Sequence, residues 1–176
     1  GIISPLLHGV TSIIDEAEFD AERWYRILQD EEVSVWYTAP TAIRALRKVG
    51  PDEPKKYNYH FKHMTTVGEP IEPEVWRWYH KEVGKGEAII VDTWWQTENG
   101  GFLCSTLPAI KPMKPGSAGP GMPGIHPIVY DNDGNIVPAG SGKAGNICIQ
   151  NPWPGMFQTI WGDRDRFVKT YFERYC

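Results

Sequence analysis

Short apolar runs alternate with amphipathic segments over the first hundred residues of the chain. Four runs rich in aliphatic and aromatic side chains have the character of β-strands, namely residues 10–14, 33–37, 63–67 and 88–92. The segments between them carry apolar side chains at helical spacing. Strands that alternate with helices form βαβ units and a mostly parallel sheet. The predicted fold class is therefore α/β.

The helical segments carry recognisable start and stop signals. Asp20 is a predicted N-cap, and Pro40 and Pro73 suit the first turns of the next two helices, which Gly50 and Gly84 can end. Around the first cap, Phe19 and Trp24 are spaced as a hydrophobic staple. The side chains expected on the buried faces are Trp24, Ile27 and Leu28, then Ile43, Leu46 and Val49, and finally Val75, Trp78, Tyr79 and Glu82.

From about residue 108 the composition shifts to Pro and Gly with short apolar runs. Residues 125–130, 136–137 and 145–150 resemble strands, and Asp133-Gly134 is a typical hairpin turn. This pattern predicts a β-rich hairpin segment. We therefore expect residues 1–107 to form an α/β subdomain and residues 108–176 to form a β-rich segment of the same large domain.

Composition narrows the classes of function. The chain has 176 residues, 41% of them hydrophobic, which is enough for a core. With 22 acidic and 18 basic residues and no long basic cluster, it is not expected to bind nucleic acid. No apolar run approaches the roughly 20 residues that span a bilayer, so a cytoplasmic protein without membrane contact is expected. The widely spaced Cys104, Cys148 and Cys176 indicate reduced thiols.

Polar segments follow three of the predicted strands. These segments are residues 38–41, 68–70 and 92–98. The carboxyl ends of parallel strands lie at one edge of a sheet, and this edge is where open α/β sheets bind ligands. The sequence therefore predicts that the three segments line one cleft.

The third segment has the most unusual composition. Residues 91–101 run Val-Asp-Thr-Trp-Trp-Gln-Thr-Glu-Asn-Gly-Gly, which places two indoles, two hydroxyls and two carboxylates close together before a pair of glycines. Such a set suits a pocket that stacks an aromatic ring and holds a cation near phosphates. We expect this segment to be a ligand loop and not a core element.

This run closely resembles the Asp-Thr-Trp-Trp-Gln-Thr-Glu signature of AMP-forming acetyl-CoA synthetases, which are adenylate-forming enzymes. Other blocks that resemble the family follow its order and occupy residues 37–46, 67–71, 114–119 and 122–124. Asn99 departs from the pattern, because the family commonly has Thr there. The resemblance covers nearly the whole chain and implies the later part of a large N-terminal domain, truncated at both ends, whose missing remainder belongs to the same chain.

The resemblance implies an acetate–CoA ligase. Such an enzyme uses ATP, acetate and coenzyme A to form acetyl-CoA, AMP and diphosphate through acetyl-adenylate. Acetate and the triphosphate are both anionic, so a divalent cation, expected to be Mg²⁺, and fixed donors must offset their repulsion. The expected partners are these small molecules, with no nucleic acid and no membrane.

The resemblance also implies roles for individual residues. Glu98 matches the magnesium ligand, although a carboxylate that caps the following turn is the alternative. Thr97 is implied as a phosphate contact and, with Glu98, as a catalytic residue. Trp94 is implied as a wall beside the base, with core packing as its alternative. The full set of implied nucleotide contacts is Gly68, Glu69, Pro70, Asp92, Thr93, Trp94, Trp95, Gln96 and Thr97.

Trp95 and Val67 are implied to form the acyl pocket. A bulky ring that fills the pocket rejects a longer acid by overlap, and this exclusion can exceed the ~1–3 kcal/mol that one methylene contributes in an open apolar site. Acetate is therefore the expected acid, with propionate or another short acid as the alternative.

A third possibility is of another class: a non-catalytic binding or scaffold module that retains the fold. The chain lacks the family's upstream phosphate loop, its downstream Thr-Gly-Asp motif and its C-terminal domain with the adenylation lysine. We therefore expect no catalysis by this polypeptide alone.

Overall fold

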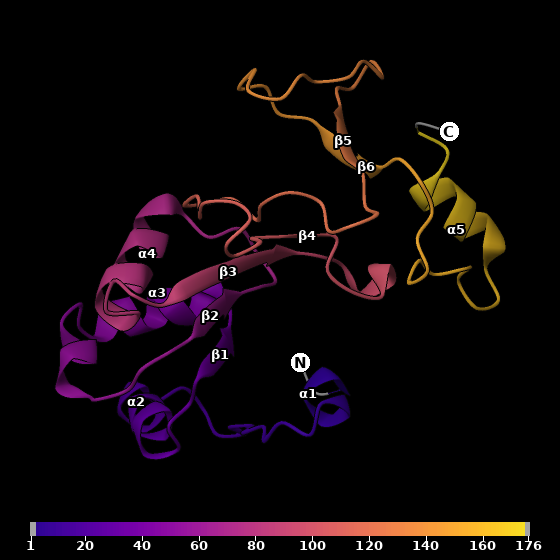
Figure 1. Ribbon diagram of the computed structural model, residues 1–176. Helices are drawn as coiled ribbons and strands as arrows, with labels where there is room; N and C mark the ends of the chain where they lie inside the picture. Colours follow the sequence, from indigo (N-terminus) through magenta and orange to yellow (C-terminus); the bar gives the residue numbers. More distant parts are fainter. Residues whose placement is uncertain (1–2, 175–176) are drawn as a thin grey trace. The chain divides into compact units, whose positions relative to one another are not determined.

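A computed structural model describes residues 3–174 and divides them into two compact units (Figure 1). The first unit comprises the residues up to Asp92 together with Thr106–Ser117, and the second comprises Thr93–Ser105 together with the residues from Ala118 onward. None of the described helices is long and apolar enough to cross a membrane.

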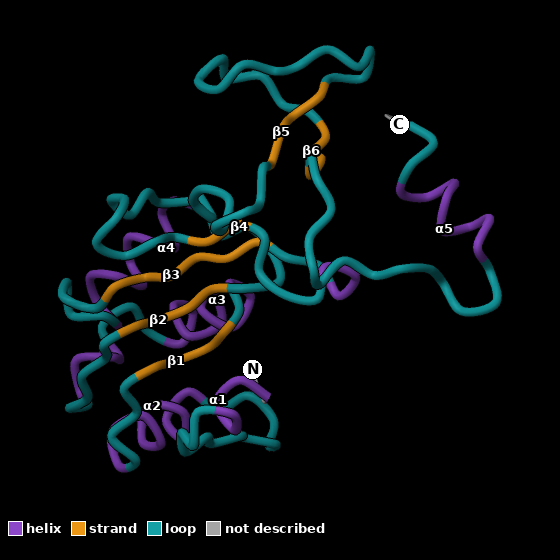
Figure 2. The backbone as a smooth tube through the Cα atoms, turned by 45° about the vertical axis from the view of Figure 1, so that its right-hand side comes forward, coloured by secondary structure: helices purple, strands orange, loops and turns teal. Residues whose placement is uncertain are grey.

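The first unit is built on three parallel strands. β1 (Val35–Thr38) pairs with β2 (His63–Thr66), and β2 pairs with β3 (Ile89–Trp94), in the order β1-β2-β3 (Figure 2). Each connection contains helical structure, as is usual for the crossover between two parallel strands. The predicted α/β class with a parallel sheet is confirmed.

The three predicted helical segments start at the predicted residues, and the second and third end before Gly50 and Gly84. α2 (Ala21–Asp30) starts after Asp20, whose Oδ1 accepts a hydrogen bond from the Arg23 N–H at 2.7 Å. The staple is confirmed, because the Phe19 and Trp24 rings meet edge to face at 5.1 Å. The remaining helical elements are α1 (Ile3–Leu7), α3 (Pro40–Val49), the 3₁₀ turn η1 (Glu53–Lys56), α4 (Pro73–Trp78) and the π-helical turn η2 (Tyr79–Val83). Of these, α1 and η1 were not predicted.

The core of the first unit lies between these helices and the sheet. Its fully buried side chains include Tyr25, Ile43, Leu46, Met64, Tyr79, Val83 and Ile90. Two expectations are wrong. Val49 is 56% exposed, because steps of three residues fall short of a helical turn and drift off the buried face. Residues 10–14 form no strand: they pair with no neighbouring strand in the described chain, and strand propensity without a partner gives no ladder.

The second unit is mostly β-structure and loops. Thr93 and Trp94 at the end of β3 pair in antiparallel fashion with β4 (Cys104–Ser105). β5 (Pro127–Tyr130) and β6 (Asn146–Ile149) form an antiparallel pair, which confirms the separate hairpin segment. The turn after β5 is held by Asp131, whose Oδ1 accepts from the Asn135 N–H at 2.8 Å. One more helix, α5 (Arg164–Tyr171), was not predicted.

Two of the three cysteines lie in the described residues. Cys104 is buried and Cys148 is half-buried. Cys176 lies outside the described residues.

Candidate functional site

The carboxyl ends of the three parallel strands are aligned residue by residue. Thr38 at the end of β1 is the register partner of Thr66 in β2, and Thr66 is the register partner of Asp92 in β3. The segments that leave β1 and β2 therefore start at the same edge of the sheet, and Asp92 lies beside them. The starts of the segments 38–41 and 68–70 therefore lie near Asp92, whereas the cleft that they are expected to line with residues 92–98 stays a prediction.

Asp92 is part of the sheet and not of a loop. It is 4% exposed, and its Oδ1 accepts a hydrogen bond from the Thr66 hydroxyl at 2.6 Å. Thr93 and Trp94 also belong to β3, because the strand continues by pairing with β4. The expectation that the whole run, residues 91–101, is a loop is thus wrong for residues 91–94, which lie in β3. A role for Asp92 and Thr93 in nucleotide contact stays a prediction.

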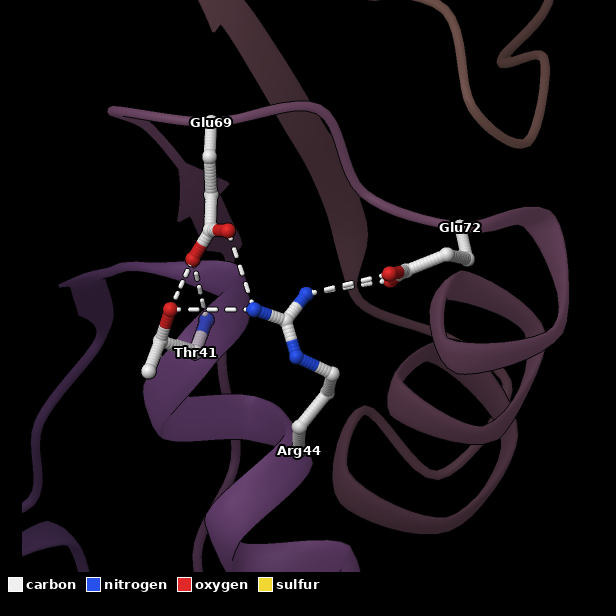
Figure 3. A network of polar contacts seen from close by, with 4 residues as sticks. All are labelled: Thr41, Arg44, Glu69 and Glu72. Atoms are coloured by element: carbon white, nitrogen blue, oxygen red, sulfur yellow. Dashed lines mark hydrogen bonds and ion pairs between the residues drawn. The ribbon is translucent and has the colours of Figure 1, made fainter.

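The segment after β2 is anchored to α3 through Glu69. Its Oε1 accepts hydrogen bonds from the Thr41 N–H at 2.8 Å and from the Thr41 hydroxyl, and its Oε2 accepts from Arg44 Nη2 at 2.9 Å (Figure 3). Arg44 Nη1 reaches both oxygens of Glu72, at 3.2 and 3.1 Å. The hydrogen bond from the Thr41 hydroxyl, followed by the bond from Arg44, lowers the pKa of Glu69. Sequence reasoning placed Glu69 here but missed both of its partners.

The backbone on either side of Glu69 is accessible. Gly68 and Pro70 are exposed, and Gly68 has φ +94°, a conformation that L-residues with side chains rarely adopt. Val67, the predicted pocket residue, is half-buried. The backbone of 68–70 can therefore meet a ligand, which the predicted adenine contact requires.

In the second unit, Trp95, which is predicted to fill the acyl pocket, is partly exposed. The Trp95 ring is 37% exposed and meets Phe102 edge to face at 6.1 Å, while Trp94 is half-buried in β3. Gln96 and Thr97 are exposed. Val67 belongs to the first unit, and the pocket that Trp95 and Val67 are predicted to share stays a prediction.

Glu98 lies in the 3₁₀ turn η3 (Thr97–Asn99), which distant segments hold in place. Its carboxylate Oε1 accepts a hydrogen bond from the Tyr171 hydroxyl at 3.1 Å, and its main-chain oxygen accepts from the Phe157 N–H at 3.3 Å. Trp153 Nε1 donates to the Asn99 oxygen at 2.8 Å. These partners were missed, because no local pattern links positions so far apart in the chain.

The chemistry of the donors fits a cation that arrives with phosphates. Across residues 3–174, no group of three or more His, Cys, Asp or Glu side chains is arranged to hold a metal. Mg²⁺ is commonly bound by one or two carboxylates, phosphate oxygens and water. Glu98 is half-buried and suits such a shared site, whereas an all-protein cage is not present among these residues.

Comparison with known proteins gives the family. The model of the AMP-binding enzyme family matches residues 1–161. The chain belongs to this family. Acetyl-coenzyme A synthetase of Wolinella succinogenes is 47% identical over 97% of the chain, and that of Methanothrix soehngenii is 46% identical over 99%. The crystal structure of Brucella canis acyl-CoA synthetase aligns with 82% of the chain at a TM-score of 0.69 and 35% identity, over 26% of its own chain.

This member of the AMP-binding enzyme family corresponds to a part of those relatives. It spans 26% of the length of both acetyl-coenzyme A synthetases. The matched part includes the aligned strand ends, the segment 68–70 and the Trp-Trp run.

Proposed function

We propose that the chain is part of an AMP-forming acetate–CoA ligase. An acetate oxygen attacks the α-phosphorus of ATP, the bond to the pyrophosphate oxygen breaks, and acetyl-adenylate and diphosphate form. The thiol sulfur of coenzyme A then attacks the acetyl carbon. The bond between that carbon and the phosphate oxygen breaks, AMP leaves, and the thiol proton passes to solvent. The near-complete coverage of this chain by proteins named acetyl-coenzyme A synthetase carries the proposal.

The residues of the aligned sheet edge and of the Trp-Trp run would bind different parts of the nucleotide and its metal ion. The accessible backbone at Gly68, Glu69 and Pro70 would contact adenine. Residues 92–97 would contact the nucleotide, with Thr97 at the phosphates. Glu98 would hold Mg²⁺, which when bound neutralises charge on the triphosphate.

The acid would bind where Trp95 and Val67 narrow its pocket. Together these roles belong to a subdomain of residues 1–107 followed by a β-rich segment, 108–176, of the same large domain. We place the enzyme in the cytoplasm, where ATP and coenzyme A are available, and we expect no membrane or nucleic-acid partner.

The test uses the full-length protein that contains this chain. We expect acetate-dependent ATP–pyrophosphate exchange, and acetyl-CoA and AMP in equal amounts once coenzyme A is added. A higher kcat/KM for propionate than for acetate would replace the proposal by the short-chain alternative. Absence of exchange with either acid would favour a scaffold module. The polypeptide of residues 1–176 alone is expected to show no exchange.

A further inference from the structure

The first turn of α3 lacks a cap of its own. Ala39 at the N-cap position has no side-chain hydrogen bond, and Pro40 has no N–H to offer. The N–H of Thr41 is therefore the first backbone donor of the helix, and Glu69 Oε1 accepts it at 2.8 Å. A carboxylate is favoured there by the positive end of the helix dipole. Glu69 thus caps α3 from a segment 28 residues away in the chain.

Arg44 binds both Glu69 and Glu72, which lie on either side of residues 70 and 71. Its Nη2 donates to Glu69 Oε2 at 2.9 Å and to the Thr41 hydroxyl oxygen at 3.0 Å, while Nη1 donates to both oxygens of Glu72 (Figure 3). A guanidinium group is planar and presents its donors in a fixed fork, so it can hold two carboxylates at a set separation. The side chains of Arg44 and Glu69 are 31% and 36% exposed, so the network is partly shielded from water.

The segment is also fixed from the core side. Ile71, between the two carboxylates, is 2% exposed. The ring of Pro70 and the positive φ of Gly68 limit the remaining backbone freedom. The backbone of 68–70 is therefore held by the core and by the network, while Gly68 and Pro70 stay exposed.

We propose that Thr41 and Arg44 are positioning residues for base recognition. They bind the Glu69 carboxylate and so fix the backbone of 68–70 in the shape that contacts the base. Glu69 then contributes to the nucleotide site through its main chain, while its carboxylate caps the N-terminus of α3. This inference rests on the proposed function of 68–70. A rigid backbone distinguishes adenine from guanine, because the group at position 6 is a hydrogen-bond donor in adenine and an acceptor in guanine.

The main test replaces Arg44 by Met in the full-length protein. Arg44→Met keeps the unbranched stem and removes the fork. We expect KM for ATP to rise about tenfold, as for the loss of hydrogen bonds to a charged group, with KM for acetate unchanged. The preference for ATP over GTP, measured as a ratio of kcat/KM values, should fall with it. Arg44→Lys restores one charge without the fork and should lie between Arg44→Met and wild type.

Arg47→Met is the matched control. Arg47 Nη2 pairs with Glu74 Oε1 at 2.5 Å, which links α3 to α4 without touching Glu69. A merely structural role for these arginines would make Arg47→Met and Arg44→Met equivalent. We expect the wild-type preference for ATP in Arg47→Met. Thr41→Val keeps the branched shape and should also lower the preference for ATP over GTP. This second variant provides the test if Arg44→Met fails to fold.

Calorimetric titration of the same proteins with ATP and with GTP separates the two proposals. Loss of base discrimination on binding in Arg44→Met and Thr41→Val supports the positioning role, whatever acid the enzyme uses. Unchanged discrimination in both folded variants would overturn it. Failure of the wild type to form acetyl-CoA would instead count against the proposed function and leave the binding result intact.

Discussion

The phenolic hydroxyl of Tyr171 donates a hydrogen bond to Oε1 of Glu98 at 3.1 Å and so ties α5 to the η3 turn. The Tyr171 ring itself packs edge to face on Phe157 at 4.8 Å. The hydroxyl orients the carboxylate, while the ring belongs to an aromatic cluster of the second unit. These two contributions can be separated by one substitution.

Tyr171→Phe should weaken the binding of divalent cations without unfolding the protein. Partners that orient a metal ligand typically contribute tenfold or more in affinity, so about tenfold more Mg²⁺ should be needed for half-maximal acetyl-CoA synthesis. Titration of the nucleotide complex with Mn²⁺, followed by electron paramagnetic resonance, should show the same change. Equal Mn²⁺ affinity in variant and wild type would show that Tyr171 does not orient Glu98 for metal binding.

Trp95→Gly should widen the range of acids that the full-length enzyme accepts. If Trp95, which is 37% exposed, narrows the acyl pocket as proposed, its removal takes away the overlap that excludes longer chains. We expect kcat/KM for pentanoate relative to acetate to rise by about tenfold or more. Trp161→Gly is the matched control, because that ring is 98% exposed and its loss should leave the preference unchanged. An unchanged ratio in Trp95→Gly would remove Trp95 from the pocket.

Thr66→Val should loosen the pairing of β2 with β3. The substitution keeps the branched shape but removes the hydroxyl that donates to the buried Asp92 carboxylate. Loss of this buried hydrogen bond should lower the local free energy of opening by about 1 kcal/mol, measured by hydrogen exchange of the β3 amides. The control Thr65→Val removes a half-buried hydroxyl bond of 3.3 Å to the Trp36 oxygen and should have a smaller effect.

Gly100→Ala should distort the turn that carries Glu98, whereas Gly101→Ala should not. Gly100 has φ +71°, and a Cβ there would collide with the main-chain oxygen of Gly155. A Cβ on Gly101 would meet no atom within 4 Å. We expect faster hydrogen exchange at 97–101 and a lower melting temperature for Gly100→Ala only. Similar behaviour of the two variants would contradict the close approach of Gly155.

The Glu69 carboxyl should titrate below its ordinary range. Its pKa is lowered first by the Thr41 hydroxyl and then by Arg44. A lowered folded-state pKa means that the network contributes stability above about pH 4.3, the usual glutamate value, and loses it as pH falls through the lower folded value. Carbon-13 NMR of labelled glutamate should show the Glu69 pKa returning upward in Thr41→Val and Arg44→Met, and a pKa that stays in place would exclude both partners.

Local signals in the sequence were sufficient for much of the fold. The cap at Asp20, the start of α3 at Pro40 and the end of the helical segment before Gly84 were all predicted, because capping and periodicity depend on residues within a turn or two. Where the pattern was short or lacked a partner strand, as in residues 10–14, the prediction failed. The helix α5 was missed because its apolar stripe is narrow: Phe167 is its one buried residue.

The sequence alone indicated the family, the parallel sheet and which segments leave its carboxyl edge, since strands that alternate with helices run parallel and end at one edge. Only the tertiary structure decided the polar partners. Thr66 meets Asp92, Glu69 caps the helix of Thr41 and Arg44, and Tyr171 orients Glu98, across 26, 28 and 73 positions of the chain respectively. Such pairs form when folding brings one donor within about 3 Å of one acceptor. Neither periodicity nor composition encodes that distance.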